Sequence, residues 1–164
     1  MRVARLVKKK IYLDTSVINH LYAEDTPEKM KDTILFWKNI MDVNEFEIYI
    51  SDLVISELAE CSEPKRQNMF NSLEQLKYIK IEQTDQVLDL AEEYLKNKVL
   101  SEKSMDDLIH IAFAVTNNIN YIVSWNFKHF VNIKTIDMVN AINILLGYRT
   151  IQIFPPSMIM GGVN

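Results

Sequence analysis

The sequence predicts an α/β fold in which helices cover both faces of a mainly parallel sheet of about five strands. Two observations support this prediction. Short runs rich in β-branched and aromatic residues alternate with longer runs of helical periodicity, and several of the helical runs begin at recognisable capping residues. Such alternation is typical of parallel sheets, because parallel strands need long crossover connections.

Five short runs are expected to form the strands, since each is rich in isoleucine, valine, tyrosine or phenylalanine. In chain order they are Lys10–Asp14, Phe46–Ile50, Tyr78–Glu82, Tyr121–Ser124 and Thr150–Phe154. In a sheet of this kind the functional site lies beyond the carboxyl ends of the strands, near a topological switch point. Polar residues at these ends are therefore the first candidates for function.

Helices are expected between the strands. Thr26-Pro27 predicts a helix start with proline at the first helical position. The other expected helices, each with the residue that precedes or ends it, are Asp52–Cys61 after Ser51, Asp85–Leu100 after Thr84, Met105–Thr116 after Ser104, and Ile136–Leu146 before Gly147. The run Met105–Thr116 is apolar nearly all round, which predicts a central, buried helix.

The composition is that of an ordinary globular protein. The chain has 164 residues, of which 48% are hydrophobic and 24% charged, which is enough to bury a core. We expect one domain over residues 1–164, with a core of about 10–155 and an apolar tail of 156–164. A single cysteine, Cys61, excludes an intrachain disulfide framework and suits a reducing compartment, so we expect a cytoplasmic protein.

Two segments have features of membrane signals. Met1–Lys10 is basic, like the start of a secretory signal, but Asp14 interrupts any apolar continuation. Leu108–Phe127 carries no formal charge, yet it contains Asn117 and Asn118 and is expected to form a buried helix and a strand. We therefore expect no membrane association.

Charge is distributed unevenly along the chain. The net charge is -4, with acids in excess over residues 11–107 and basic groups in excess at both ends. This pattern is compatible with a polyanion bound through a cation, and equally with an acidic protein that has no such ligand.

Three acidic residues stand where the predicted fold places a functional site. Asp14 ends the first strand, Glu57 lies in the helix after the second strand, and Asp107 opens the most apolar helix. Structural alternatives are a strand-end cap for Asp14, a solvated helical position for Glu57, and for Asp107 the capping pattern that begins at Ser104. Carboxylates brought together repel one another unless they share a hard divalent cation. The constellation therefore predicts a Mg2+ or Mn2+ site.

Other polar residues lie close to these acids in the sequence. Thr15 and Ser16 follow the first acid, where one of them can cap the next helix and leave a hydroxyl near the carboxylate. Asn19, one turn further on, is expected to contact the residues that bind the metal and not the metal itself. His110, one turn beyond the third acid, is expected either to bind a site carboxylate or the scissile phosphate, or to be a hydrogen-bonded core residue.

Four segments together resemble the PIN-domain family, and especially its bacterial VapC-like toxin branch. They are Ile11–Leu21 (IYLDTSVINHL), Leu53–Leu58 (LVISEL), Asp107–Ala114 (DLIHIAFA) and Ile122–Phe130 (IVSWNFKHF). The first three resemble the motifs that carry the family's acids, and the fourth resembles the segment after its fourth strand. The resemblance covers residues 10 to about 155, and the order and spacing of the segments are more specific than any one of them.

This resemblance implies a three-layer α/β/α fold and endonucleolytic cleavage of RNA with Mg2+ or Mn2+. It implies that Asp14, Glu57 and Asp107 are catalytic and bind the metal. For the toxin branch it also implies a homodimer that a cognate antitoxin neutralises. Asn126 stands where many members have a fourth acid, so the resemblance implies a neutral oxygen donor there. This favours a single ion, or a weakly held second ion, over a symmetric pair of ions.

The segment after the fourth strand offers further candidates and one alternative function. Lys128 and His129 are expected either to contact phosphate or to belong to a solvated loop, and Trp125 either to stack a base or to pack in the core. With Asn126 marking a degenerate acidic position, the chain is alternatively a non-catalytic PIN-like module that binds RNA or protein. A receiver domain or a haloacid-dehalogenase-type phosphatase fits less well, because the paired acid and the D-x-D pattern that these need are missing.

Overall fold

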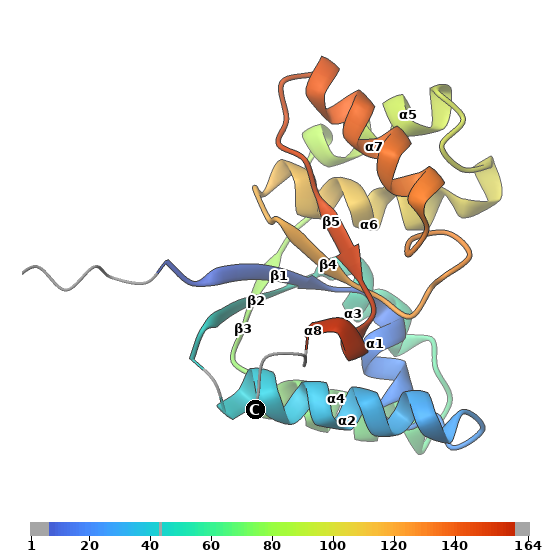
Figure 1. Ribbon diagram of the computed structural model, residues 1–164. Helices are drawn as coiled ribbons and strands as arrows, with labels where there is room; N and C mark the ends of the chain where they lie inside the picture. Colours follow the sequence, from blue (N-terminus) through green and yellow to red (C-terminus); the bar gives the residue numbers. More distant parts are fainter. Residues whose placement is uncertain (1–6, 43, 160–164) are drawn as a thin grey trace, which may run out of the picture.

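The computed structural model describes residues 7–42 and 44–159, which form a three-layer α/β/α fold. Five strands make one parallel sheet in the order β3-β2-β1-β4-β5. In Figure 1, α2 and α4 lie on one side of this sheet, and α5, α6 and α7 lie on the other. The predicted α/β class, with a parallel sheet covered on both faces, is confirmed.

All five predicted strands are present, within about two residues of their predicted bounds. The strands are β1 (Lys9–Leu13), β2 (Phe46–Ser51), β3 (Tyr78–Ile81), β4 (Tyr121–Val123) and β5 (Gln152–Phe154). The helices are α1 (Thr15–His20), α2 (Pro27–Asp42), α3 (Asp52–Ala59), α4 (Lys65–Gln75), α5 (Asp85–Lys96), the 3-10 turn η1 (Glu102–Ser104), α6 (Met105–Thr116), α7 (Ile133–Leu145) and α8 (Pro156–Ile159).

The strand order creates a switch point between β1 and β4. The chain proceeds outward from β1 through β2 to β3, then crosses back to β4 and β5 on the opposite side of β1. Crossovers in the two directions place their helices on opposite faces of the sheet. Asp14 directly follows β1 and Ser124 directly follows β4, so both lie where ligands bind in sheets of this kind.

The core lies on both faces of the sheet. Three successive residues of β1, Ile11, Tyr12 and Leu13, are buried, as expected for a strand covered on both sides. Helix α6 is buried from Leu108 to Val115 without interruption, which confirms its predicted central position. Because α6 is packed so tightly, the polar side chains that it carries are held firmly in place.

Four predicted helix starts are confirmed. The helix α2 begins at Pro27, and α6 begins at Met105. The Ser51 hydroxyl accepts a hydrogen bond from Val54 N at 3.2 Å and caps α3, and the Thr84 hydroxyl accepts one from Val87 N at 3.3 Å and caps α5.

Other helix ends differ from the prediction. Helix α5 ends at Lys96 rather than Leu100, because the backbone of Lys98 is left-handed, with a φ of 57°. Helix α7 begins at Ile133, three residues earlier than predicted, because Asn132 caps it by accepting from Thr135 N at 2.9 Å. Its predicted end at Gly147, which has a φ of 82°, is confirmed.

A further difference concerns α1. The residue that precedes this helix is Asp14, and neither Thr15 nor Ser16 occupies the capping position. Both hydroxyls instead bind carboxylates, because the chain turns directly from β1 into α1 and brings them to the crevice.

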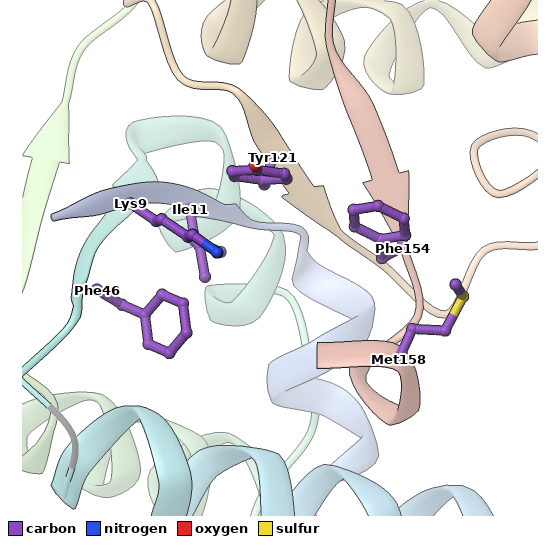
Figure 2. Close-up of a pocket in the computed structure, with 6 residues that line it drawn as sticks. All are labelled: Lys9, Ile11, Phe46, Tyr121, Phe154 and Met158. Carbon is purple, nitrogen blue, oxygen red and sulfur yellow. The ribbon is translucent and has the colours of Figure 1, made fainter. Parts of the chain in front are cut away.

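A cavity of about 210 Å3 opens on the face of the sheet towards α2 (Figure 2). It is lined by Lys9, Ile11, Phe46, Tyr121, Phe154 and Met158. Lys9, Phe46 and Tyr121 are the first residues of their strands, whereas Asp14 follows the last residue of β1. At about 3.3 Å per residue, the five steps from Lys9 to Asp14 separate these two residues by roughly 16 Å. The residues that line the cavity include none of the three acids.

No helix within the described ranges is both long enough and apolar enough to cross a membrane. The uncharged segment Leu108–Phe127 forms most of α6, then β4 and the start of the following loop, in agreement with the prediction. The first part of the basic amino-terminal segment, residues 1–6, lies outside the described residues.

Candidate active site

Asp14 is fixed in the crevice by two hydroxyl groups. Its side chain is only 7% exposed, and its Oδ2 accepts hydrogen bonds from Ser16 Oγ at 2.7 Å and from Ser124 Oγ at 2.8 Å. Trp125 N donates to Ser16 Oγ at 2.9 Å, which ties the loop after β4 to α1. With Oδ2 occupied in this way, Asp14 Oδ1 lies 3.8 Å from the Nε2 of His110.

Glu57 reaches the same histidine from α3. Its Oε1 lies 2.5 Å from His110 Nε2 and accepts a hydrogen bond from Thr15 Oγ1 at 2.8 Å. The side chain is 32% exposed, so one part of the carboxylate is held by protein groups while another part faces solvent. Residues far apart in the sequence thus converge at this point.

His110 is the centre of a buried chain of hydrogen bonds. Its Nδ1 lies 2.6 Å from the Tyr12 hydroxyl, which lies 2.7 Å from Ser51 Oγ. When His110 is protonated, Nδ1 donates to Tyr12 and Tyr12 donates to Ser51; when Nδ1 carries no proton, both hydroxyls turn and donate in the opposite direction. The chain from Ser51 to Glu57 is therefore satisfied in both protonation states.

The pKa values of this pair move apart in the directions that favour an ion pair. Burial alone would lower the pKa of His110, but its hydrogen bond to Glu57 and the charges of Asp14, Glu57 and Asp107 outweigh burial and raise that pKa. Burial alone would raise the pKa of Glu57, yet the hydrogen bond and charge of His110, together with the Thr15 hydroxyl, lower it. The fold therefore stabilises a positive charge among the acids.

Asp107, in the first turn of α6, binds a second histidine. Its Oδ2 lies 2.6 Å from His129 Nδ1, and its side chain is 23% exposed. Burial raises the pKa of Asp107, and the charge of Asp14 adds to this effect, while the hydrogen bond and charge of His129 oppose it. The Ser104 side chain forms no capping hydrogen bond, so the capping pattern does not account for Asp107.

The donor chemistry fits a hard divalent cation, although the acids are held apart by histidines. Within residues 7–42 and 44–159, no three His, Cys, Asp or Glu side chains are grouped closely enough to hold a metal ion as they stand. Among the same residues, Asp14 Oδ1, Glu57 Oε2 and Asp107 Oδ1 form no hydrogen bond. Each acid thus keeps one carboxylate oxygen, the ligand that Mg2+ and Mn2+ prefer. The sharing of one ion by the three acids stays a prediction.

The other predicted residues are placed in different ways. Asn19 Oδ1 accepts a hydrogen bond from the Lys65 ammonium group of α4, which ties α1 to α4. Asn126 Oδ1 accepts from His129 N at 3.0 Å and so stabilises its own loop. Lys128 is exposed on this loop and forms no ion pair with a described acid.

Trp125 belongs to the core, which confirms one of its two interpretations. Its side chain is buried, and its Nε1 donates to Thr33 Oγ1 of α2 at 2.8 Å.

Sequence reasoning missed several residues of the site. In the sequence Tyr12 is only part of the first predicted strand, and Ser51 is only the residue that precedes a helix. The prediction includes Ser124 in the fourth strand, although a polar residue at the carboxyl end of a strand beside β1 is a signal for a role at the switch point.

The chain is similar to known proteins in both sequence and fold. The family model described as the PIN domain matches residues 11–132. Among solved structures, the chain is similar to DNA-bound VapBC from Salmonella typhimurium, with 17% identity, a TM-score of 0.53, and coverage of 90% of this chain and 98% of the other. It is also similar to VapBC2 from Rickettsia felis bound to a DNA fragment from their promoter, with 16% identity, a TM-score of 0.51, and coverage of 89% and 98%. None of the curated proteins matches the chain.

Proposed function

The chain belongs to the PIN domain family, and from this membership we propose that it is a metal-dependent endoribonuclease that hydrolyses phosphodiester bonds of single-stranded or looped RNA. One observation carries the proposal. Asp14 and Glu57, from separate elements, both approach the buried Nε2 of His110, and the charge of Asp107 acts on the same ring. An anionic pocket that raises the pKa of a buried histidine is suited to binding a doubly charged cation.

The proposed cofactor is Mg2+ or Mn2+, which Asp14, Glu57 and Asp107 would hold. When bound, such an ion polarises a phosphoryl oxygen and activates water. The protein supplies the positioning: Ser16 and Ser124 occupy Asp14 Oδ2 and leave Oδ1 for a ligand.

The remaining positioning groups act on the other two acids. Thr15 and His110 orient Glu57, and His129 orients Asp107. Each histidine places a donor against one carboxylate, which reduces repulsion between the acids before an ion is bound.

The test is cleavage of a labelled single-stranded RNA with Mg2+, Mn2+ or EDTA, with single-stranded DNA of the same sequence as the comparison substrate. We expect cleavage of RNA only, and only with a divalent ion. Asp14→Asn and Asp107→Asn should each reduce the rate by at least roughly 100-fold, since a ligand to such an ion supplies about 3 kcal/mol or more of transition-state stabilisation. The matched control is Asp106→Asn, an exposed neighbour that should retain full activity. Cleavage that persists in EDTA and in both variants would reject the mechanism.

We further propose that the chain is the toxin of a type II toxin–antitoxin pair, a cytoplasmic homodimer that a cognate antitoxin neutralises. In support, both structurally similar complexes are DNA-bound VapBC assemblies. Co-expression with the product of a neighbouring small reading frame should suppress toxicity and yield a complex. Light scattering on the purified chain should give twice the chain mass of 19.2 kDa. A monomer with no neighbouring partner would contradict this assignment and leave the ribonuclease proposal intact.

One observation favours the alternative of a non-catalytic module. Asn126, which stands at the fourth acidic position, uses its Oδ1 within its own loop. A degenerate site of this kind should show no rise in melting temperature with Mg2+ or Mn2+, whereas a working site should show one, because a ligand that binds only the folded state stabilises it.

A further inference from the structure

We propose that Phe127 and Lys29 bind one nucleotide of single-stranded RNA beside the cleaved bond, with the base stacked on the Phe127 ring and a phosphate bound to the Lys29 ammonium group. This inference rests on the proposed ribonuclease function and names the part of the site that holds the substrate strand.

The exposure of Phe127 is the first observation. Among the Phe, Tyr and Trp side chains of residues 7–42 and 44–159, Phe127 is the one in the exposed class, with 46% of its surface accessible. Trp125, two residues earlier, is 7% exposed and anchored to Thr33. The exposed ring leaves an aromatic face on which an unpaired base can stack.

The position of the ring is fixed. Phe127 N donates to Trp125 O at 3.0 Å, and the two rings lie 6.0 Å apart with an interplanar angle of 57°. The amide of Asn132 donates to Phe127 O and Lys128 O, and Phe130 N donates to Asn126 O. A ring held on such a loop is preorganised, which lowers the entropic cost of stacking a base on it.

A cation lies beside the ring. Lys29 Nζ lies 5.3 Å from the centroid of Phe127 and 5.6 Å from that of Trp125. Lys29 forms no ion pair with a described carboxylate, so its donors remain available to a phosphate. Residues 108–136 contain Lys128 and Lys134 and no acid, which favours the approach of a polyanion to this loop.

The loop joins this pair to the acids. Ser124, whose hydroxyl binds Asp14, is three residues before Phe127, and His129, which binds Asp107, is two residues after it. Three residues span at most about 10 Å, so the ring lies within reach of a strand whose phosphate is at the acids. Stacking on an aromatic ring beside a cation is the usual way in which proteins hold unpaired bases.

The experiment is the binding of a fluorescently labelled eight-nucleotide oligoadenylate to the full chain in EDTA, where no cleavage is expected. Phe127→Leu keeps the apolar volume and removes the aromatic face, and we expect it to weaken binding about tenfold. Phe127→Tyr should restore binding. An oligonucleotide of the same length without bases should bind wild type and Phe127→Leu equally.

Lys29→Gln tests the phosphate contact. It should reduce the slope of log affinity against log salt concentration by about 0.7, the value for one phosphate of a single strand. The matched control is Lys31→Gln, an exposed lysine of the same helix that should leave the slope unchanged. Melting curves of each variant verify that the fold is retained.

Equal oligoadenylate affinity for wild type and Phe127→Leu would overturn the inference. So would a loss, in Phe127→Ala, of binding to a protein partner without any loss of RNA binding, because the ring would then be a protein contact. The two proposals can be contradicted separately. Metal-dependent cleavage together with RNA binding that does not depend on Phe127 contradicts only the inference about Phe127. RNA binding that depends on Phe127, without any cleavage, supports that inference and contradicts the proposed ribonuclease activity.

Discussion

Replacing Tyr12 with phenylalanine should damage both stability and activity, because the Tyr12 hydroxyl connects the helix cap Ser51 to His110. It lies 2.7 Å from Ser51 Oγ and 2.6 Å from His110 Nδ1, and all three side chains are buried. In Tyr12→Phe, Ser51 Oγ keeps the hydrogen bond from Val54 N, but His110 Nδ1 loses its partner. A buried polar atom without a partner costs about 1–3 kcal/mol, and the hydrogen bond lost by Ser51 adds about 0.5–1.5 kcal/mol.

We therefore expect Tyr12→Phe to lower the free energy of unfolding by about 1.5–4.5 kcal/mol. For a chain of this length that corresponds to a fall in melting temperature of roughly 3–18 °C. His110 orients Glu57, so the rate of cleavage, measured well below the melting temperature, should also fall. A loss of about 10- to 100-fold is typical when a group that hydrogen-bonds to a metal ligand is removed.

Tyr94→Phe is the matched control. The Tyr94 hydroxyl is also buried and donates to Asn143 Oδ1 at 2.5 Å, but this bond links α5 to α7. Its loss should lower stability to a similar extent and leave cleavage unchanged. Urea unfolding measures the first effect, and single-turnover cleavage of labelled RNA measures the second. Unfolding of Tyr12→Phe like that of wild type, or equal cleavage by the two variants, would show that the Tyr12 hydroxyl does not have this role.

Three further predictions follow from the same contacts. The pKa of His110 is raised, so its contribution to stability is complete below about pH 6.5 and is lost as the pH rises through the raised value. The pKa of Glu57 is lowered, so its contribution is lost as the pH falls below about 4.5 through the lowered value. Between pH 6 and 9 the melting temperature should therefore fall more steeply for wild type than for Glu57→Gln, and an identical fall in both would contradict the ion pair. Thr33→Val removes the acceptor of the buried Trp125 Nε1 and should cost about 1–3 kcal/mol in urea unfolding, with no loss arguing that water replaces the hydroxyl. Ser124→Ala removes one of the two hydroxyls on Asp14 and should slow cleavage by about 10- to 100-fold, unless Ser16 alone fixes the carboxylate.

The sequence was sufficient to predict the elements whose signals are local. The strands and the starts of α2, α3 and α5 depend on side-chain patterns and caps within a few residues. The helix ends that differ from the prediction are set by single residues whose backbone or capping role is hard to recognise in the sequence. The start of α7 is set by the Asn132 cap, and the end of α5 by the left-handed backbone at Lys98, a conformation that lysine rarely adopts.

The site was predictable only in part. Asp14, Glu57 and Asp107 lie at the expected strand and helix ends, because parallel topology brings such ends to one edge. The partners of these acids could not be derived in the same way. Tyr12 is 98 residues from His110, and His129 is 22 residues from Asp107, so their contacts depend on the packing of α6 against the sheet and the loop after β4.

The most direct test of the central claim is a crystal structure with Mn2+, located by its anomalous scattering. We expect the ion to be coordinated by oxygens of Asp14, Glu57 and Asp107 at about 2.0–2.3 Å, with Glu57 and Asp107 released from His110 and His129. An ion bound elsewhere, with both carboxylates still paired to their histidines, would contradict the account.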